Sequence, residues 1–261
     1  MLRKGTAGNL KVEIYESRKA MGDAAAKDAV EALKEVIAEK GSVNVIFAAA
    51  PSQNEFLAAL AKSDVDWTKV HGYHMDEYIG LDAAAPQGFG NFLRRGIFDL
   101  VPFASVDYLN GGAEDIEAER LRYSKILADN PVDIVFMGIG ENGHIAFNDP
   151  AVAHFDDQNL VNIVALDERC RNQQVHDGCF EKIEQVPTHA LTLTVPALFR
   201  AKKLFCMVPA ATKAEAVGKT VLGEVREMVP ATIMRMHKNA TLYVDPDSGK
   251  ELLDAGFGTE A

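Results

Sequence analysis

The sequence has few cysteines, no long apolar run and no excess of basic residues, and each shortage excludes a class of protein. Its 261 residues contain three cysteines, Cys170, Cys179 and Cys206, too few for a secreted scaffold held together by disulfides. No apolar run approaches the ~20 residues that a membrane-spanning helix needs. The formal net charge is −11 at pH 7, whereas a nucleic-acid-binding surface needs clustered lysine and arginine. We therefore expect neither a membrane nor a nucleic acid as a partner.

The composition is otherwise that of an ordinary globular protein. Hydrophobic residues make up 48 % of the chain and charged residues 25 %, which is typical of a globular domain. A chain of this length can bury one large core, so we expect a single domain over residues 1–261. Residues 1–6 lack the apolar segment of a secretory signal, so a cytoplasmic location with reduced thiols is expected.

Strand-like apolar runs alternate with helical patterns along most of the chain. Strands are predicted at residues 9–15, 43–49, 70–75, 106–109, 132–137, 160–165, 190–194, 203–208 and 240–244. Helices are predicted at residues 17–40, ended by Gly41, at 114–129, and at 213–222 with Thr212 as N-cap. Another helix is expected to begin at a capping box formed by Ser52 and Glu55. This alternation predicts an α/β fold with a mostly parallel sheet that is covered by helices on both faces.

A glycine-rich turn after residues 132–137 is the most informative segment. The preceding run is apolar and β-branched, as in a buried parallel strand. Gly138, Gly140 and Gly143 then let the backbone turn sharply. Because ligands of open α/β sheets bind at the carboxyl ends of strands, the polar residues of this turn are candidate site residues. They are Glu141, Asn142, His144 and Asp149.

The three glycines also spell the GxGxxG pattern of dinucleotide-binding proteins. That pattern requires a long helix that begins at the last glycine, whereas Asn148, Asp149 and Pro150 interrupt the segment within seven residues. We therefore reject a dinucleotide site. A glycine turn with one buried, hydrogen-bonded histidine is an equal alternative to a catalytic site when this segment is taken alone.

A second strand end carries two carboxylates. Asp76 and Glu77 directly follow the strand predicted at 70–75, where burial would raise the proton affinity of a carboxylate and suit it to general base catalysis. A role in a turn or helix cap is the alternative. Cys170, His176 and Cys179 lie close in sequence, but their spacing matches no common zinc pattern, so no metal is expected.

Two motifs together resemble the glucosamine-6-phosphate isomerase/deaminase family, whose superfamily also includes 6-phosphogluconolactonase. They are YHMDEYIGL at residues 73–81 and GIGENGHIAFNDP at residues 138–150, supported in family order by residues 186–194 and 211–216. The resemblance implies a Rossmann-like α/β fold, no cofactor, and conversion of an amino-sugar phosphate to a ketose phosphate with release of ammonia. It also implies a small-molecule sugar phosphate as partner and leaves a homo-oligomer open.

The resemblance assigns catalytic roles to four residues. Asp76 matches the base that moves the C2 proton to C1, and His144 matches the histidine that assists ring opening. Asp149 stands where the family usually has a glutamate that orients this histidine. Asn142 stands where an aspartate is usual, and an amide cannot neutralise a histidine that becomes positively charged. Glu141 is the neighbour that could compensate.

The resemblance also implies substrate contacts, and several positions depart from the family pattern. The implied substrate-binding residues are Ala49, Ser52, Glu77, Gly138, Gly140, Gln174 and Lys213. Pro51 has no amide hydrogen to donate to a phosphate, and Glu55 adds a negative charge. Gln174 stands where an arginine is usual, a loss for which Arg169 or Arg171 could substitute. These departures predict weaker phosphate binding and a substrate that differs from glucosamine 6-phosphate.

Two other functions stay open. A 6-phosphogluconolactonase would use His144 in lactone hydrolysis, but the Met75–Tyr78 motif favours the deaminase. A sugar-sensing module without catalysis would need a partner protein, because no helix-turn-helix region fits before Asn9. We therefore rank the sensing module last.

Overall fold

A nine-stranded sheet forms the centre of the computed structural model, which describes residues 1–260. The strand order is β12-β1-β2-β11-β10-β7-β3-β4-β6. The bounds are β1 (Arg3–Ala7), β2 (Leu10–Ile14), β3 (Val43–Phe47), β4 (Val70–His74), β6 (Ser105–Asp107), β7 (Ile134–Met137), β10 (Lys203–Val208), β11 (Ala240–Val244) and β12 (Thr259–Glu260). Strands β2 to β6 in this order pair in parallel, and β1 and β12 add an antiparallel edge. This confirms the predicted, mostly parallel α/β sheet.

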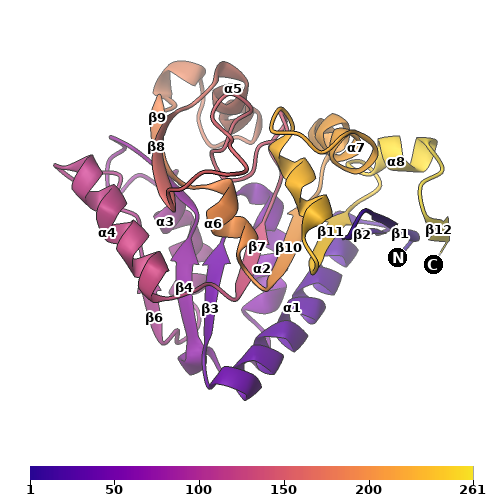
Figure 1. Ribbon diagram of the computed structural model, residues 1–261, viewed down its shortest axis with the longest axis horizontal. Helices are drawn as coiled ribbons and strands as arrows, with labels where there is room; N and C mark the ends of the chain where they lie inside the picture. Colours follow the sequence, from indigo (N-terminus) through magenta and orange to yellow (C-terminus); the bar gives the residue numbers. More distant parts are fainter. Residues whose placement is uncertain (261) are drawn as a thin grey trace.

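Helices cover both faces of this sheet (Figure 1). They are α1 (Arg18–Lys40), α2 (Asn54–Leu60), α3 (Phe89–Leu93), α4 (Ile116–Asp129), α5 (Glu168–His176), α6 (Val195–Phe199), α7 (Ala214–Leu222) and α8 (Lys250–Asp254). On β7, Ile134 and Phe136 belong to the core that includes α1 and α2, whereas Val135 and Met137 belong to the core that includes α4, α6 and α7. Both faces of the strand are buried, which explains why its sequence is continuously apolar.

The ends of α1 follow the sequence closely. The side chain of Ser17 accepts a hydrogen bond from the backbone N–H of Ala20 at 3.1 Å and caps the helix. Gly41 ends it in the left-handed conformation, with φ of 83°. None of the helices within residues 1–260 combines the length and the apolar character needed to cross a membrane.

Two predicted helix caps are wrong. A 3₁₀ turn, Ala211–Lys213, precedes α7, so Thr212 lies inside a turn and caps nothing. Ser52 likewise lies inside the 3₁₀ turn Pro51–Gln53, and α2 begins without a side-chain cap. The hydroxyl of Ser52 instead accepts a hydrogen bond from the Gln53 side chain at 3.0 Å. Both turns leave polar side chains at the carboxyl ends of strands.

A second, antiparallel sheet lies over one end of the central sheet. Its strands are β5 (Asp76–Tyr78), β9 (His189–Leu193) and β8 (Val161–Ala165). The sequence predicted β8 and β9 as strands but did not predict β5 or a separate sheet. Figure 1 shows β8, β9 and α5 at the top, opposite the turn that joins α1 to β3. They therefore lie at the end of the molecule toward which the parallel strands run.

Candidate active site

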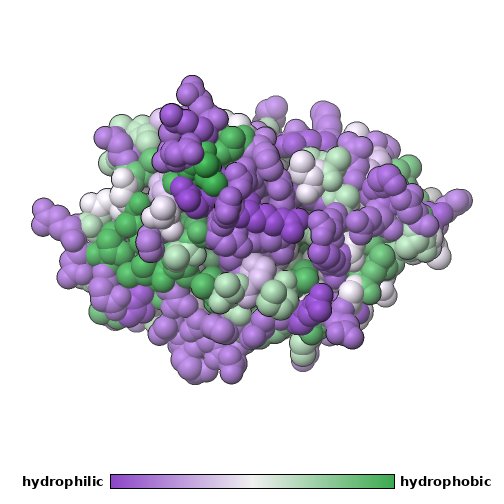
Figure 2. Space-filling view, turned by 90° about the horizontal axis from the view of Figure 1, so that it is seen from above, coloured by the Kyte–Doolittle hydropathy of each residue, from purple (hydrophilic) through white to green (hydrophobic). Residues whose placement is uncertain are grey.

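A pocket opens at the carboxyl ends of β3, β7 and β10, the edge where open α/β sheets bind ligands. The turns that follow these three strands supply most of its wall. Eight predicted site residues line it: Ala49, Ser52, Asp76, Gly138, Gly140, His144, Gln174 and Lys213. Figure 2 looks onto this end of the molecule, where the central surface is mainly hydrophilic. The pocket lining itself combines charged side chains such as Asp76, His144 and Lys213 with apolar ones, so it suits a ligand that carries polar groups.

The glycines of the turn after β7 make room for His144. A Cβ atom added to Gly140 would lie 2.1 Å from Cε1 of the His144 ring, so no side chain fits there. Gly143 has φ of 87°, a conformation that favours glycine. The backbone N–H of Gly140 donates to the His144 carbonyl at 2.9 Å and closes the turn. The pattern thus serves to hold an imidazole against the backbone at the pocket wall.

Asp149 lies behind His144 and faces the imidazole. Its Oδ1 is 3.1 Å from Nδ1 of His144, and both side chains are buried. Burial acts to raise the pKa of Asp149, but hydrogen bonding and charge from His144, together with Asn142 and the Asp167 N–H, lower it below its ordinary value. Asp149 is therefore ionised and can orient the ring and stabilise its protonated form.

Asn142 also lies behind His144 and bridges two carboxylates. Its Nδ2 donates to Asp149 at 2.8 Å and to Asp167 at 3.0 Å. Its Oδ1 accepts a hydrogen bond from the backbone N–H of His144 at 3.0 Å. The amide at this position thus joins both acids to the turn that carries His144.

Glu141 does not support His144. Its carboxylate lies 3.3 Å from Nδ1 of His176, and its backbone N–H donates to Gln173. The expectation that Glu141 compensates for the amide of Asn142 is therefore wrong. The second carboxylate of this region comes from Asp167, which the sequence interpretation missed.

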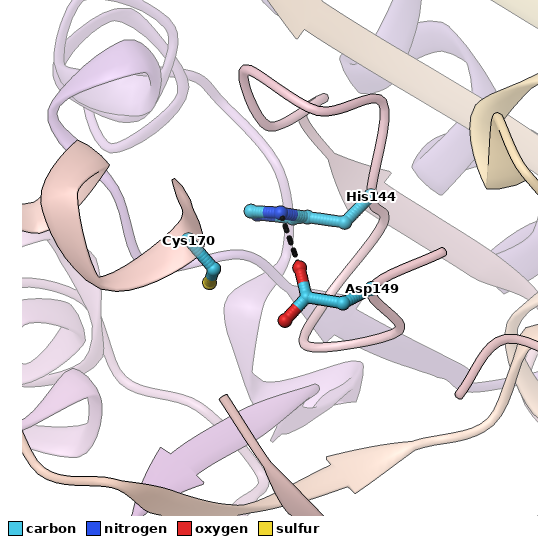
Figure 3. Close-up of side chains that lie close together, drawn as sticks. All are labelled: His144, Asp149 and Cys170. Atoms are coloured by element: carbon cyan, nitrogen blue, oxygen red, sulfur yellow. Dashed lines mark ion pairs between the residues drawn. The ribbon is translucent and has the colours of Figure 1, made fainter. Parts of the chain in front are cut away.

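Cys170 lies beside the His144–Asp149 pair (Figure 3). The potential ligand atoms of these three residues lie within 4.8 Å of one another. Burial raises the pKa of the Cys170 thiol well above its ordinary value, and the charges of Asp149 and Asp167 raise it further. A protonated thiol is a poor metal ligand, and Nδ1 of His144 is already directed at Asp149. We therefore interpret these side chains as a cluster that supports His144.

Asp76 reaches the pocket from β5 and is 6 % exposed. Burial raises its pKa well above the ordinary value of 3.8, and the charge of Glu77 adds to this shift. A carboxylate of raised proton affinity is suited to take a proton from carbon or oxygen of a bound substrate. Pairing of Asp76 with Thr192 of β9 fixes its backbone.

His74 fixes the other side of the same segment. Its Nδ1 lies 3.0 Å from the Asp76 carbonyl, and its Nε2 accepts the backbone N–H of Leu109 at 2.9 Å. Burial lowers the pKa of His74 to about 4, while the hydrogen bond to the Asp76 carbonyl and the charge of Glu119 act to raise it. A neutral ring with Nδ1–H donating to the carbonyl satisfies both contacts. His74 therefore positions Asp76 and is not part of the pocket wall.

Glu77 does not line this pocket, contrary to expectation. Its carboxylate accepts backbone N–H groups from Tyr78 and Phe89, each at 3.0 Å, and from Gly90 at 2.9 Å. Burial raises its pKa, while these hydrogen bonds act to lower it. Glu77 thus holds the start of α3, from which Phe89 reaches the pocket.

Lys213 lines the same pocket and is 5 % exposed. Within the described part of the chain, its ammonium group has no hydrogen-bonding partner. Burial lowers its pKa, and the charges of Asp177 and Glu141 oppose that shift. The preceding Ala210 has φ of 86°, which is strained for a residue with a side chain. A buried, unpaired cation on a pocket wall indicates an anionic ligand.

Arg18 is a second cation of the pocket that the sequence interpretation missed. It begins α1, its Nε lies 2.7 Å from Oε2 of Glu55, and its guanidinium donates to the Pro51 carbonyl. The negative charge of Glu55 is therefore paired with a guanidinium. Arg18 closely follows β2, which runs parallel to the other central strands. Polar residues at the carboxyl end of this strand could therefore have been listed as candidates from the sequence, and Arg18 is among them.

The arginines proposed from the sequence do not reach the pocket. Arg169 pairs with Glu215 at 2.9 Å on the surface. Arg171 donates to the carbonyls of Ile183 and Val186 at 2.8 and 3.0 Å. The expectation that either replaces the missing arginine at Gln174 is wrong, because neither side chain lines the pocket.

Comparison with known proteins assigns the family. Residues 16–243 match the family described as glucosamine-6-phosphate isomerases/6-phosphogluconolactonase. The chain belongs to this family. Glucosamine-6-phosphate deaminase of Bacillus cytotoxicus is 34 % identical over 92 % of this chain and 88 % of its own length. The enzymes of that name from Bacillus cereus strain G9842 and Streptococcus pneumoniae serotype 4 are 37 % and 36 % identical, covering 83 % and 85 % of this chain and 80 % and 93 % of their own.

Solved structures agree with this assignment. A monomeric glucosamine-6-phosphate deaminase superposes with a TM-score of 0.83 at 25 % identity, over 92 % of this chain and 99 % of its own. A 6-phosphogluconolactonase from Thermotoga maritima gives 0.73 at 17 % identity, over 90 % and 98 %. The second likeness shows the shared fold alone. The Rossmann-like fold expected from the sequence motifs is thereby confirmed.

In this member of the isomerase/lactonase family, one pocket combines a base with cations. Asp76 can accept a proton, and the His144–Asp149 pair can donate one to an oxygen atom and take it back. Lys213 and Arg18 can hold an anionic group. The arrangement therefore suits proton transfer within a small anionic substrate.

We expect Glu77→Gln to move the acidic limb of the pH profile of kcat/KM to lower pH. Removal of the negative charge lowers the pKa of Asp76, which must be ionised to act as a base. The amide also leaves the Gly90 N–H without an acceptor, so the free energy of unfolding should fall by about 1–3 kcal/mol. Steady-state rates over a pH series, with Glu117→Gln on exposed α4 as control, test this. An unmoved acidic limb contradicts the coupling.

Proposed function

We propose that this protein converts an amino-sugar phosphate to a ketose phosphate with release of ammonia, with glucosamine 6-phosphate as first candidate. One observation supports this best: a single pocket holds the buried carboxylate of Asp76, the His144–Asp149 pair and the unpaired ammonium of Lys213. The names of the relatives at 34–37 % identity support the same activity.

The proposed chemistry needs only proton transfers and water. His144 donates a proton to the ring oxygen and accepts one from the C1 hydroxyl, which opens the sugar to the aldehyde. Asp76 then takes the proton from C2 as the aldehyde oxygen gains one, which gives an enol-amine. Asp76 returns its proton to C1 as the amine loses one to solvent, so that C1 carries a hydroxyl and C2 an imine. Addition of water to C2 expels ammonia and leaves the ketose. These steps require no cofactor.

The raised pKa of Asp76 supports its role as base, because the proton of C2 is only weakly acidic. The ionised carboxylate of Asp149 supports the protonated form of His144 during ring opening. These two acids lie in different surroundings, one desolvated and one hydrogen-bonded. Such contrasting environments are typical of carboxylates with different catalytic tasks.

The phosphate is proposed to lie between Lys213 and Arg18, with the Ser52 hydroxyl as a further donor. Arg18 supplies the guanidinium that Gln174 lacks, and it offsets the charge of Glu55. This weakens the reasons for predicting poor phosphate binding. A substrate other than glucosamine 6-phosphate stays a prediction, and slow ammonia release from glucosamine 6-phosphate would support it.

We expect Arg18→Met to raise KM for the sugar phosphate about tenfold and to leave kcat nearly unchanged, because a charge-assisted hydrogen bond is worth about 1.5–3 kcal/mol. The double variant Arg18→Met/Glu55→Gln corrects for the unpaired Glu55. Arg169→Met is the matched control, since its side chain lies outside the pocket. A raised KM in Arg169→Met, with an unchanged KM in Arg18→Met, would show that Arg169 contacts the phosphate, as the sequence suggested.

Parallel assays decide between the candidate functions. Glucosamine 6-phosphate should release ammonia and fructose 6-phosphate in equal amounts, with kcat/KM of about 10⁴ M⁻¹s⁻¹ or above. Hydrolysis of 6-phosphogluconolactone alone would support the lactonase, and binding without turnover would support the sensing module. A single domain, a cytoplasmic location, the lack of a nucleic-acid partner and a homo-oligomeric state stay predictions.

A further inference from the structure

Asp167 is a half-buried link between α5 and the histidine turn. One carboxylate oxygen accepts the backbone N–H of Cys170 at 2.6 Å and caps α5. The other accepts Nδ2 of Asn142 at 3.0 Å. The backbone N–H of Asp167 donates to Oδ2 of Asp149 at 3.2 Å. The carbonyl of Asp167 accepts the backbone N–H of Arg171 at 3.0 Å. Every hydrogen-bonding group of this residue thus connects to the helix start or to the residues behind His144.

We propose that Asp167 is a positioning residue for His144, acting through Asn142 and Asp149, and that residue 142 must be an amide because Asp167 is an acid. The inference rests on the proposed function only for its kinetic readout. Asp167 does not line the pocket, so it acts on His144 and not on the substrate.

The two hydrogens of the Asn142 amide explain this requirement. One serves Asp149 and the other serves Asp167, at 2.8 and 3.0 Å. An aspartate at position 142 would replace both donors by acceptors and place three carboxylates in mutual contact. Like charges in a buried cluster repel one another strongly, and one would have to take up a proton. The resemblance leads to the opposite expectation, that an aspartate here improves support of His144.

Anchoring of Asn142 by Asp167 also fixes the backbone of the turn. The Asn142 Oδ1 accepts the backbone N–H of His144 at 3.0 Å, so rotation of the Asn142 side chain would break this hydrogen bond and free the backbone of His144. The positive end of α5 stabilises the Asp167 carboxylate, which lies at its N-cap. The helix start, the amide and Asp149 therefore form one hydrogen-bonded unit with the backbone of His144, and Asp149 faces the imidazole at 3.1 Å.

Serine at position 167 separates the two tasks of the residue. Asp167→Ser keeps a good helix cap but removes the carboxylate oxygen that holds Asn142. Asp115 offers a matched control, because it caps α4 in the same way by accepting the N–H of Ala118 at 2.9 Å and is exposed. Asp115→Ser measures how much the same exchange lowers the melting temperature at a helix cap that has no link to His144.

We expect Asp167→Ser to lower kcat at least about tenfold, since small misplacements of catalytic groups have effects of this size. KM should change less than about twofold, and the melting temperature should change as in Asp115→Ser. The Nδ1–H proton of His144, held between the ring and Asp149, should lose its protected resonance in the proton NMR spectrum of Asp167→Ser only. Unchanged kcat and an unchanged resonance would overturn the proposal.

Exchange of charge between the two positions provides an independent test. Asn142→Asp should lower kcat strongly, and Asn142→Asp/Asp167→Asn should recover part of the loss, because the third carboxylate is gone. A higher kcat in Asn142→Asp than in the wild type, or no recovery in the double variant, would overturn the proposal. If the wild-type protein releases no ammonia, the proposed function is wrong. The NMR signal needs no substrate, so it still tests the role of Asp167 in that case.

Discussion

Asp76→Asn is expected to lower kcat for ammonia release by about 10³-fold and to leave the fold intact, because general base catalysis contributes about 10²–10⁴-fold. Asparagine has the shape of aspartate and preserves the pairing of β5 with β9. It cannot accept the C2 proton. Exchange of the C2 hydrogen with solvent deuterium should stop together with turnover, and wild-type exchange in the variant would show that another group is the base.

The same variant should be more stable than the wild type, with a defined pH dependence. Burial holds the folded-state pKa of Asp76 above its ordinary value of 3.8, so the folded protein binds this proton more tightly than the unfolded chain. Wild-type stability therefore falls as pH rises from 3.8 through the folded pKa. The difference in melting temperature should grow over this interval and then stay constant. Asp177→Asn, which changes a half-buried carboxylate on the same pocket, is the control.

Local sequence rules predicted the elements of the central sheet well. Ser17 and Gly41 bound α1 as capping preferences require, and the apolar run before Gly138 is a buried parallel strand. Two caps failed, at Ser52 and Thr212, because short 3₁₀ turns precede both helices. Capping patterns describe the start of a helix and carry no information about a turn inserted before it.

The second sheet was not predictable because its pairing is non-local. Asp76 and Glu77 look like a turn in sequence, and only contact with Thr192 and Leu191 of β9 makes them a strand. Acidic residues are depleted in strands, so their strand propensity gave no signal. The consequence for function is direct, since β5 fixes the carboxylate of Asp76 at the pocket.

The residues of the site that the sequence interpretation missed share the same cause. Arg18 is far in sequence from Lys213, and Asp167 is separated from Asn142 by a strand. The family pattern pointed to nearby substitutes, Arg169 for the missing guanidinium and Glu141 for the missing carboxylate. Side chains of neighbouring residues on a helix or turn point in different directions, so sequence proximity was a poor guide.

Lys213→Met is expected to weaken substrate binding and to stabilise the protein. Loss of a charge-assisted contact to phosphate should lower kcat/KM by about two powers of ten, mainly through KM. Methionine fills similar space without a charge, so the cost of burying an unpaired ammonium disappears. Inorganic phosphate should raise the melting temperature of the wild type but not that of the variant.

The pH dependence of this stabilisation has the opposite sign to that of Asp76→Asn. Burial lowers the pKa of Lys213 below its ordinary value of 10.5, so the folded protein binds this proton less tightly than the unfolded chain. The wild type gains stability as pH rises from the folded pKa to 10.5, and the advantage of the variant should shrink over that interval. Lys219→Met, an exposed change on α7, the helix that follows Lys213, controls for loss of a lysine. Equal phosphate stabilisation of wild type and Lys213→Met would show that the buried ammonium does not face the anion.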